Sequence, residues 1–287
     1  MNVPPRPLSR TFERCRAEER AALIAYLAAG DPLPSATEEL VKGAVRGGAD
    51  IVEIGLPFSD PLADGPIIQA AYTRSLHGGT TVRSVLESVE SISGTTDVPL
   101  VLMTSWNPVL AYGPERFCAH AAAAGAAGVI VPDFLPEDSA RFRRHAQERE
   151  LDTVYLAAPD MSEQRLQAAT AATTGFLYLV SRRGVTGPTG GIGGRLESDV
   201  GRARRFCPLP IAVGFGIATS RDAARVARCA DGVIVGSTLV DEAWGALQSI
   251  PPGSVQKEQA VADVAEAVAR RTAELRAGIV SVRDMEG

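Results

Sequence analysis

Short apolar runs recur along the whole chain and are the first sign of how it folds. Eight of them are rich in β-branched or aromatic residues and are long enough for one strand each. They occupy residues 22–28, 51–55, 100–104, 128–132, 153–157, 176–180, 210–216 and 232–236. Because the runs are mostly continuous in their apolar character, each is predicted to be buried on both faces, as in a parallel sheet covered by helices.

The segments between these runs have the spacing of amphipathic helices. Examples are SATEELVKGAVRGG at 35–48, PEDSARFRRHAQERE at 136–150 and SRDAARVARC at 220–229. Several segments open with Ser, Thr or Asp, the residues expected to cap a helix N-terminus. Eight alternating strand and helix units in a chain of this length predict a (β/α)8 TIM barrel of the α/β class, in preference to a doubly wound open sheet.

A single barrel domain is predicted to span residues 1–287. No low-complexity linker divides the chain, and the only repeat is the strand and helix unit itself. Within this domain we expect residues 1–19 to be an N-terminal extension with a helix, and residues 255–277 to be a charged amphipathic helix that closes the barrel. Active sites of such barrels lie at the C-terminal ends of the strands, so candidate chemistry is expected there.

Composition narrows the range of partners. The 287 residues are 45% hydrophobic and carry a net charge of -5, so the chain can bury a large core but lacks the concentrated positive charge that nucleic acids and anionic membranes attract. The first apolar run, at 21–30, is too short to span a bilayer. The four cysteines are far apart and form no metal-binding or disulfide pattern. These features predict a cytoplasmic protein without a nucleic-acid or membrane partner.

Glycine-bearing turns follow the last three predicted strands. GVTG lies at 184–187, GFGIATS at 214–220 and VGSTLV at 235–240. Backbone N–H groups at these places can converge on one anion, because glycine lets the main chain approach phosphate oxygens without a Cβ clash. Each turn alone could be an ordinary surface turn, but together, without a P-loop motif, they predict a site for one phosphate group. The candidate residues are Gly187, Gly216, Gly236 and Ser237.

Acidic residues stand on and after the second predicted strand. Period-two alternation places Ile51, Glu53 and Gly55 on one face of that strand. If this face points into the barrel, desolvation raises the pKa of Glu53 toward neutrality, which suits a proton donor and acceptor at cellular pH. A structural Glu paired with an Arg is the alternative. Asp64 follows in a loop long enough to fold back over the same barrel mouth.

Two other residues near these acids have weaker functional indications. Asp60 precedes a proline and is expected to form a turn, or to communicate with a partner. Tyr178 shares a face of the sixth predicted strand with Phe176 and Val180, so it is expected to line the interior. Core packing is the usual role of a buried tyrosine and remains the alternative for Tyr178.

The run EIGLPFSDPLADGP at 53–66 resembles the hallmark of the tryptophan synthase alpha chain family. The other matching motifs appear in family order. They are GDP at 30–32, IIQAAYTRSLHGG at 67–79, NP at 107–108, YLVSRRGVTG at 178–187, VGFGI at 213–217 and DGVIVGS at 231–237. The resemblance implies a (β/α)8 enzyme that cleaves indole-3-glycerol phosphate into indole and glyceraldehyde 3-phosphate. It also implies that the chain holds no metal and no organic cofactor.

The resemblance assigns roles to the candidates residue by residue. Glu53 matches the family's proton-transfer glutamate, Asp64 its aspartate that binds the indole nitrogen, and Tyr178 its pocket tyrosine. The family's phosphate-binding positions match Gly187, Gly216, Gly236 and Ser237, and its indole-pocket positions match Tyr26, Ile130 and Phe215. In the implied retro-aldol reaction the indole ring is protonated at C3, Asp64 stabilises the resulting cation, and Glu53 transfers the protons.

A glycine-rich segment, SRRGVTGPTGGIGGRLES at 181–198, follows the sixth predicted strand. Its glycines make it costly to order, because each loses extra backbone entropy when it is fixed. We therefore predict a mobile lid that closes over the bound phosphate, with Thr186 as its hydrogen-bonding link to the loop after the second strand. A plain flexible surface loop is the alternative.

The resemblance further implies a tryptophan synthase beta chain as partner, in an alpha2beta2 complex. Leu135 stands where many relatives carry a proline on the surface that touches the beta chain, and the proline is moved to position 136. This departure leaves open a stand-alone indole-3-glycerol-phosphate lyase that releases free indole for specialised metabolism. A catalytically weak regulatory subunit and a sugar-phosphate epimerase or isomerase are further alternatives, but Glu53 and Asp64 in their specific run argue against both.

Overall fold

Nine parallel strands form the centre of the computed structural model, which describes residues 6–62, 64–181, 192–214, 216–251 and 253–282. The strands are β1 (Ala22–Ala28), β2 (Ile51–Gly55), β3 (Leu100–Met103), β4 (Gly128–Ile130), β5 (Asp152–Val154), β6 (Leu156–Ala157), β7 (Leu177–Val180), β8 (Ile211–Gly214) and β9 (Gly232–Val235). They are hydrogen-bonded in the order β5-β4-β3-β2-β1-β9-β8-β7-β6. Every neighbouring pair is parallel.

The two ends of this sheet belong to one extended segment of chain. Only Tyr155 separates β5 from β6, and the backbone N–H of Tyr178 in β7 donates a 3.1 Å hydrogen bond to the carbonyl oxygen of Tyr155. The predicted strand at 153–157 is therefore one barrel strand in two parts, β5 pairing with β4 and β6 pairing with β7. The eight predicted strands close into a barrel, and the predicted (β/α)8 fold is confirmed.

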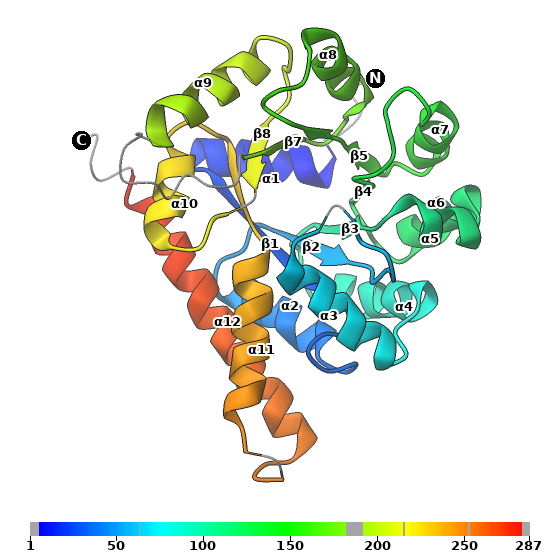
Figure 1. Cartoon of the computed structure of the whole chain (residues 1–287), viewed down its shortest axis with the longest axis vertical. Coiled ribbons are helices and arrows are strands. Elements are labelled where there is room, and N and C mark those ends of the chain that lie inside the picture. Colours follow the sequence, from blue (N-terminus) through cyan, green and yellow to red (C-terminus); the bar gives the residue numbers. More distant parts are fainter. Residues whose placement is uncertain (1–5, 63, 182–191, 215, 252, 283–287) are drawn as a thin grey trace.

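Helices pack around the outside of the barrel and, in the case of α1, across its N-terminal end (Figure 1). They are α1 (Pro7–Ala17), α2 (Thr37–Arg46), α3 (Pro66–His77), α4 (Val82–Ser93), α5 (Trp106–Tyr112), α6 (Pro114–Ala123), α7 (Ala140–Glu148), α8 (Glu163–Ala172), α9 (Ile192–Arg204), α10 (Ser220–Ala227), α11 (Ser237–Ser249) and α12 (Lys257–Val280). The helix expected at 255–277 is α12, which packs against α2, α10 and α11. Thr219 caps α10 as predicted for such helices, whereas α2 follows Ala36 and has no side-chain cap.

Strand alternation divides the core into two layers. Val52 and Ile54 of β2 pack in the layer between the sheet and the helices, and Ile51 packs inside the barrel. In-register pairing sets Glu53 between Tyr26 of β1 and Val101 of β3, which are both interior residues. The side chain of Glu53 therefore belongs to the barrel interior, as the alternation of the sequence predicted.

Helix α1 closes the N-terminal end of the barrel. Leu8, Phe12 and Cys15 of this helix are buried and belong to the interior cluster. The ring of Phe12 lies 5.6 Å from that of Phe176, which is fully buried just before β7. Apolar burial on this scale stabilises the fold by about 1.5–3 kcal/mol per large side chain. Among the described residues, α1 therefore fills the interior at this end.

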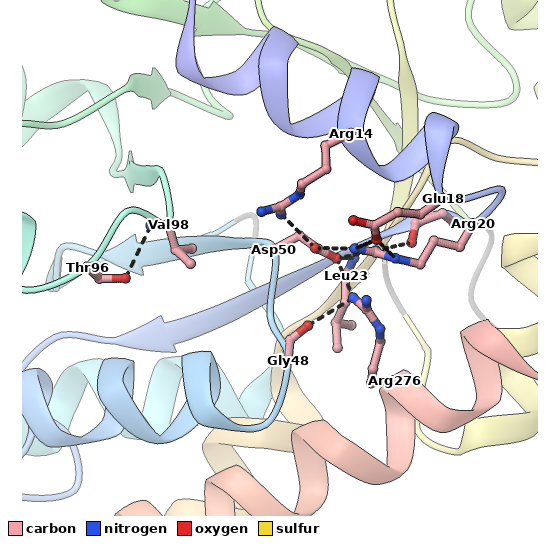
Figure 2. A network of polar contacts seen from close by, with 10 residues as sticks. Arg14, Glu18, Arg20, Leu23, Gly48, Asp50, Thr96, Val98 and Arg276 are labelled. Carbon is pink, nitrogen blue, oxygen red and sulfur yellow. Dashed lines mark hydrogen bonds and ion pairs between the residues drawn. The ribbon is translucent and has the colours of Figure 1, made fainter.

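Asp50, the residue before β2, joins both ends of the chain to the barrel (Figure 2). Its carboxylate accepts hydrogen bonds from Arg14 of α1 at 3.0 Å, from Arg20 at 2.7 and 2.8 Å, and from Arg276 of α12 at 2.7 Å. It also accepts the backbone N–H of Leu23 at 2.9 Å. Burial alone would raise the pKa of Asp50, but the bonds from Arg20 and Leu23 and the charge of Arg276 outweigh it and lower that pKa.

We expect Asp50→Asn to destabilise the protein by about 3–5 kcal/mol at neutral pH, because Arg14 and Arg276 would lose the carboxylate they bind and the buried Arg20 would keep only the exposed Glu18 as counter-charge. The depressed pKa of Asp50 means that its stabilisation is present above the unfolded pKa and is lost as pH falls. Urea unfolding should therefore show a difference between variant and wild type that shrinks below pH about 4. Glu266→Gln, in an exposed ion pair with Arg46, is the control and should change stability by less than about 0.5 kcal/mol.

Candidate active site

A cavity of about 320 Å³ opens at the C-terminal ends of the strands. It is lined by Tyr26, Asp64, Gly65, Pro66, Ile67, Ile68, Met103, Tyr178, Gly216, Ile217, Ile234, Gly236 and Ser237. Six residues singled out from the sequence are therefore brought together around one space, with a carboxylate and the start of a helix among otherwise mostly apolar walls. Apolar walls with a few convergent polar groups are the usual composition of a small-molecule site.

Glu53 is not among the residues that line this cavity. Its side chain is 0% exposed, and neither carboxyl oxygen has a hydrogen-bond partner. Burial raises the pKa of Glu53 from 4.5 to about 8, so the group is protonated at neutral pH. The expected raised pKa is found, and its cause is the expected desolvation.

Three tyrosines lie near Glu53: burial is the main cause that raises the pKa of each hydroxyl, and the charge of Glu53 adds to it. The hydroxyl groups of Tyr26 on β1 and Tyr72 on α3 are hydrogen-bonded to each other at 2.7 Å. Both lie over Gly55, where an added Cβ would come within 2.1 Å of the Tyr26 oxygen and 2.8 Å of the Tyr72 oxygen. Gly55 is therefore required for this arrangement, and the hydroxyl pair lies two residues further along β2 than Glu53, toward the barrel mouth.

Asp64 lies in the loop between β2 and α3 and is half-buried. Burial, followed by the negative charge of Asp133, raises the pKa of Asp64 to about 6. Its backbone is held at both sides, because its N–H donates to the carbonyl of Pro61 at 3.0 Å and its carbonyl accepts Nε2 of Gln69 at 2.9 Å. At neutral pH Asp64 is thus mostly ionised and Glu53 mostly protonated.

Helix α3, which starts two residues after Asp64, is fixed to the end of β1 and the loop that follows. Arg74 donates to both carboxylate oxygens of Asp31 at 2.6 and 3.0 Å, and its guanidinium lies 4.1 Å from the centre of the Trp244 ring. The hydroxyl of Ser75 donates to the carbonyl of Ala29 at 2.5 Å. These contacts hold α3, and with it the loop of Asp64, over the barrel mouth.

Another part of the cavity lining has the features of an anion site. Helix α11 begins at Ser237, with Gly236 as its N-cap and no side-chain cap on its N–H groups. The positive end of its dipole therefore faces the cavity. Gly216 has a φ of +76°, which only glycine adopts easily. Thr238 fixes the neighbouring loop by donating to the carbonyl of Ile217 at 2.9 Å.

The remaining predicted site residues are not found among those that line the cavity. Ile130 of β4 is fully buried in the barrel interior and pairs with Met103, but it does not line the cavity among the described residues. Residues 182–191 of the predicted lid, which include Thr186 and Gly187, lie outside the residues that the structure describes. Phe215 also lies outside them.

Several apolar lining residues and Tyr72 were not predicted from the sequence. Met103 and Ile234 follow the same inward alternation as other barrel residues, so that signal was available. No sequence pattern indicates Tyr72 in the same way. It lies on a helix and reaches the site because α3 packs on β1.

Comparison with known proteins identifies the family. A family model described as tryptophan synthase alpha chain matches residues 12–272. The chain belongs to the tryptophan synthase alpha chain family. Alpha chains from Streptomyces coelicolor and Geobacter sulfurreducens are 46% and 43% identical to it, in both cases over 81% of this chain and over 86% and 88% of theirs.

Solved tryptophan synthase structures share the fold. A chain of the Mycobacterium tuberculosis enzyme, in an open form with BRD0059 bound, is 37% identical with a TM-score of 0.82 and covers 96% of this chain and 99% of that one. The alpha subunit from Legionella pneumophila is 34% identical with a TM-score of 0.82 and covers 94% and 98%.

Family membership confirms the predicted enzyme class and reaction. The tryptophan synthase alpha chain is a carbon–carbon lyase that cleaves indole-3-glycerol phosphate to indole and glyceraldehyde 3-phosphate in tryptophan biosynthesis. Within the described part of the chain, no helix is long and apolar enough to cross a membrane. The described residues also contain no group of three or more His, Cys, Asp or Glu that could hold a metal ion.

The raised pKa of Glu53 has a consequence for stability. Because its pKa is higher in the folded state, the folded protein binds more protons than the unfolded chain between pH about 4.5 and about 8, so wild-type stability falls as pH rises through that window. We expect Glu53→Gln, which removes this effect, to unfold at higher urea concentration than wild type, most clearly above pH 8. Equal midpoints at pH 5 and a growing difference up to pH 9 would support this, whereas a pH-independent difference would contradict it.

Proposed function

We propose that Glu53 and Asp64 carry the proton chemistry of this cleavage. The main observation behind the proposal is that Glu53 is a fully buried carboxyl group without a hydrogen-bond partner, on the strand that leads to the cavity lined by Asp64. Leaving such a group unpaired destabilises the fold, so its presence favours a function. A pKa of about 8 for Glu53 and about 6 for Asp64 gives one proton donor and one carboxylate at neutral pH.

The reaction then needs two proton transfers and no added reagent. Glu53 gives its proton to C3 of the indole ring, and the positive charge that spreads to the ring nitrogen is stabilised by the Asp64 carboxylate. The Glu53 carboxylate next takes the proton from the hydroxyl beside the ring. The C–C bond breaks as that oxygen becomes the aldehyde, its electrons return to the ring, and Glu53 is protonated again.

The rest of the cavity is proposed to bind the two ends of the substrate. The N-terminus of α11 at Ser237, with Gly236 and Gly216, would hold the phosphate through backbone N–H groups and the Ser237 hydroxyl, and Gly187 would join them. Tyr26 and Tyr178 would contact the ring and the glycerol chain, since both line the cavity. Anchoring the phosphate at one end converts binding energy into correct placement of C3 at the other.

We expect Glu53→Gln and Asp64→Asn to lower kcat by about 10²–10⁴-fold, with KM nearly unchanged, because the phosphate and ring contacts remain. The measurement is indole release from indole-3-glycerol phosphate by the purified chain. Asp97→Asn is the matched control, since Asp97 is exposed before β3 at the opposite end of the barrel. Wild-type turnover in either active-site variant would contradict the assigned role.

The same end of the barrel is proposed to dock a tryptophan synthase beta chain. Large apolar side chains are exposed after three consecutive strands: Leu62 after β2 at 94%, Leu110 after β3 at 56% and Leu135 after β4 at 47%. Solvent-exposed leucines clustered at one end are typical of a partner surface. Leu135 replaces the proline of many relatives but keeps the position apolar, which favours the beta chain over the stand-alone lyase.

We expect Leu110→Asp and Leu135→Asp to abolish stimulation of lyase activity by a beta chain while the activity of the isolated chain stays unchanged. A charge placed in an apolar interface is left desolvated and unpaired, so association weakens. Lyase rates with and without a beta chain test this, and Val255→Asp, an exposed apolar site before α12, is the control. A wild-type chain that is fully active alone and not stimulated would instead favour the stand-alone enzyme.

A further inference from the structure

A second cavity, of about 250 Å³, adjoins the substrate cavity. Asp64 and Met103 line both cavities, so the two spaces are neighbours on either side of these residues. Tyr26 lines only the substrate cavity and Tyr72 only the second one. The second cavity continues to the exposed residues Asp60 and Leu62.

The hydrogen bond between Tyr26 and Tyr72 therefore crosses the boundary between the two cavities. Its two oxygens are 2.7 Å apart, and both side chains are almost completely buried, at 5% and 3% exposure. Together with Met103, the tyrosine pair forms a wall between the two cavities. The hydrogen bond between the two hydroxyl groups closes this wall.

The wall is held firmly from the side of Tyr72. This tyrosine lies on α3, two and three residues before the Arg74 and Ser75 side chains that bind Asp31 and Ala29. The backbone of Tyr72 is therefore fixed together with the helix. Tyr26 is a strand residue and is equally fixed by the pairing of β1 with β2.

We propose that Tyr72 is a specificity-determining residue that limits the size of the ring the lyase accepts. The inference rests on the proposed place of Asp64 at the indole nitrogen, which puts that edge of the ring against the wall. A substituent at ring position 7, beside the nitrogen, meets the Tyr26–Tyr72 pair. A substituent at position 4, beside C3, points away from the wall.

The test uses the reverse reaction, in which C3 of an indole adds to the aldehyde of glyceraldehyde 3-phosphate. We expect Tyr72→Leu to join the two cavities and to raise the kcat/KM for 7-methylindole relative to indole about tenfold, the scale of one methyl group in a pocket. Tyr72→Phe keeps the ring and loses only the hydroxyl contact, so a smaller rise of about threefold is expected. The ratio for 4-methylindole should stay at the wild-type value in both variants.

Tyr155→Leu and Tyr155→Phe are matched controls, because Tyr155 is a buried tyrosine of the outer core layer and should leave all ratios unchanged. A folded Tyr72→Leu variant with the wild-type ratio for 7-methylindole would overturn the proposal. If thermal melting shows that Tyr72→Leu does not fold, an unchanged ratio in Tyr72→Phe would overturn it. Failure of the proposed acid roles is measured separately, by full activity of Glu53→Gln or Asp64→Asn on unsubstituted substrate.

Discussion

The site depends on one unpaired carboxyl group in the barrel interior. Two acids lie three residues apart, Asp50 just before β2 and Glu53 within it, and their surroundings in the barrel are opposite in kind. Asp50 is surrounded by three arginines and stays ionised, whereas Glu53 has no partner and keeps its proton. The register of β2 between β1 and β3 fixes which acid enters the interior, and a slip of one residue would bring Val52 or Ile54 there instead.

The stabilising contacts and the candidate reactive groups lie at different ends of the same strands. At the N-terminal end, α1 fills the interior and Asp50 joins α1, β1 and α12 by charge-assisted bonds. At the C-terminal end, the walls come from the strand ends, the loops, α3 and α11, which leave a cavity. The stable end compensates for the cost of burying Glu53, so the cavity end can hold groups chosen for reactivity instead of packing.

Much of the fold followed from the sequence, because strand runs, helix periods and glycine turns are local signals. The alternation along 51–55 placed Glu53 inside, and the run to residue 66 placed Asp64 at the mouth. The break at Tyr155 and the fully buried Ile130 were not predicted, since both depend on how neighbouring strands meet. Tyr72 was missed for the same reason: its partner Tyr26 is 46 residues away, and no spacing encodes a contact between a helix and a distant strand.

The bonds from Arg14, Arg20 and Arg276 to Asp50, here called the Asp50 clamp, also set an order for assembly during synthesis. Arg14 and Arg276 bind the same carboxylate, although 262 residues separate them (276 − 14). While the chain is being made, early strands can collapse on α1, but the clamp is incomplete until α12 has left the ribosome. Half-made barrels therefore expose strand edges until β9 pairs with β1, and the bond between Arg276 and Asp50 can form only after that.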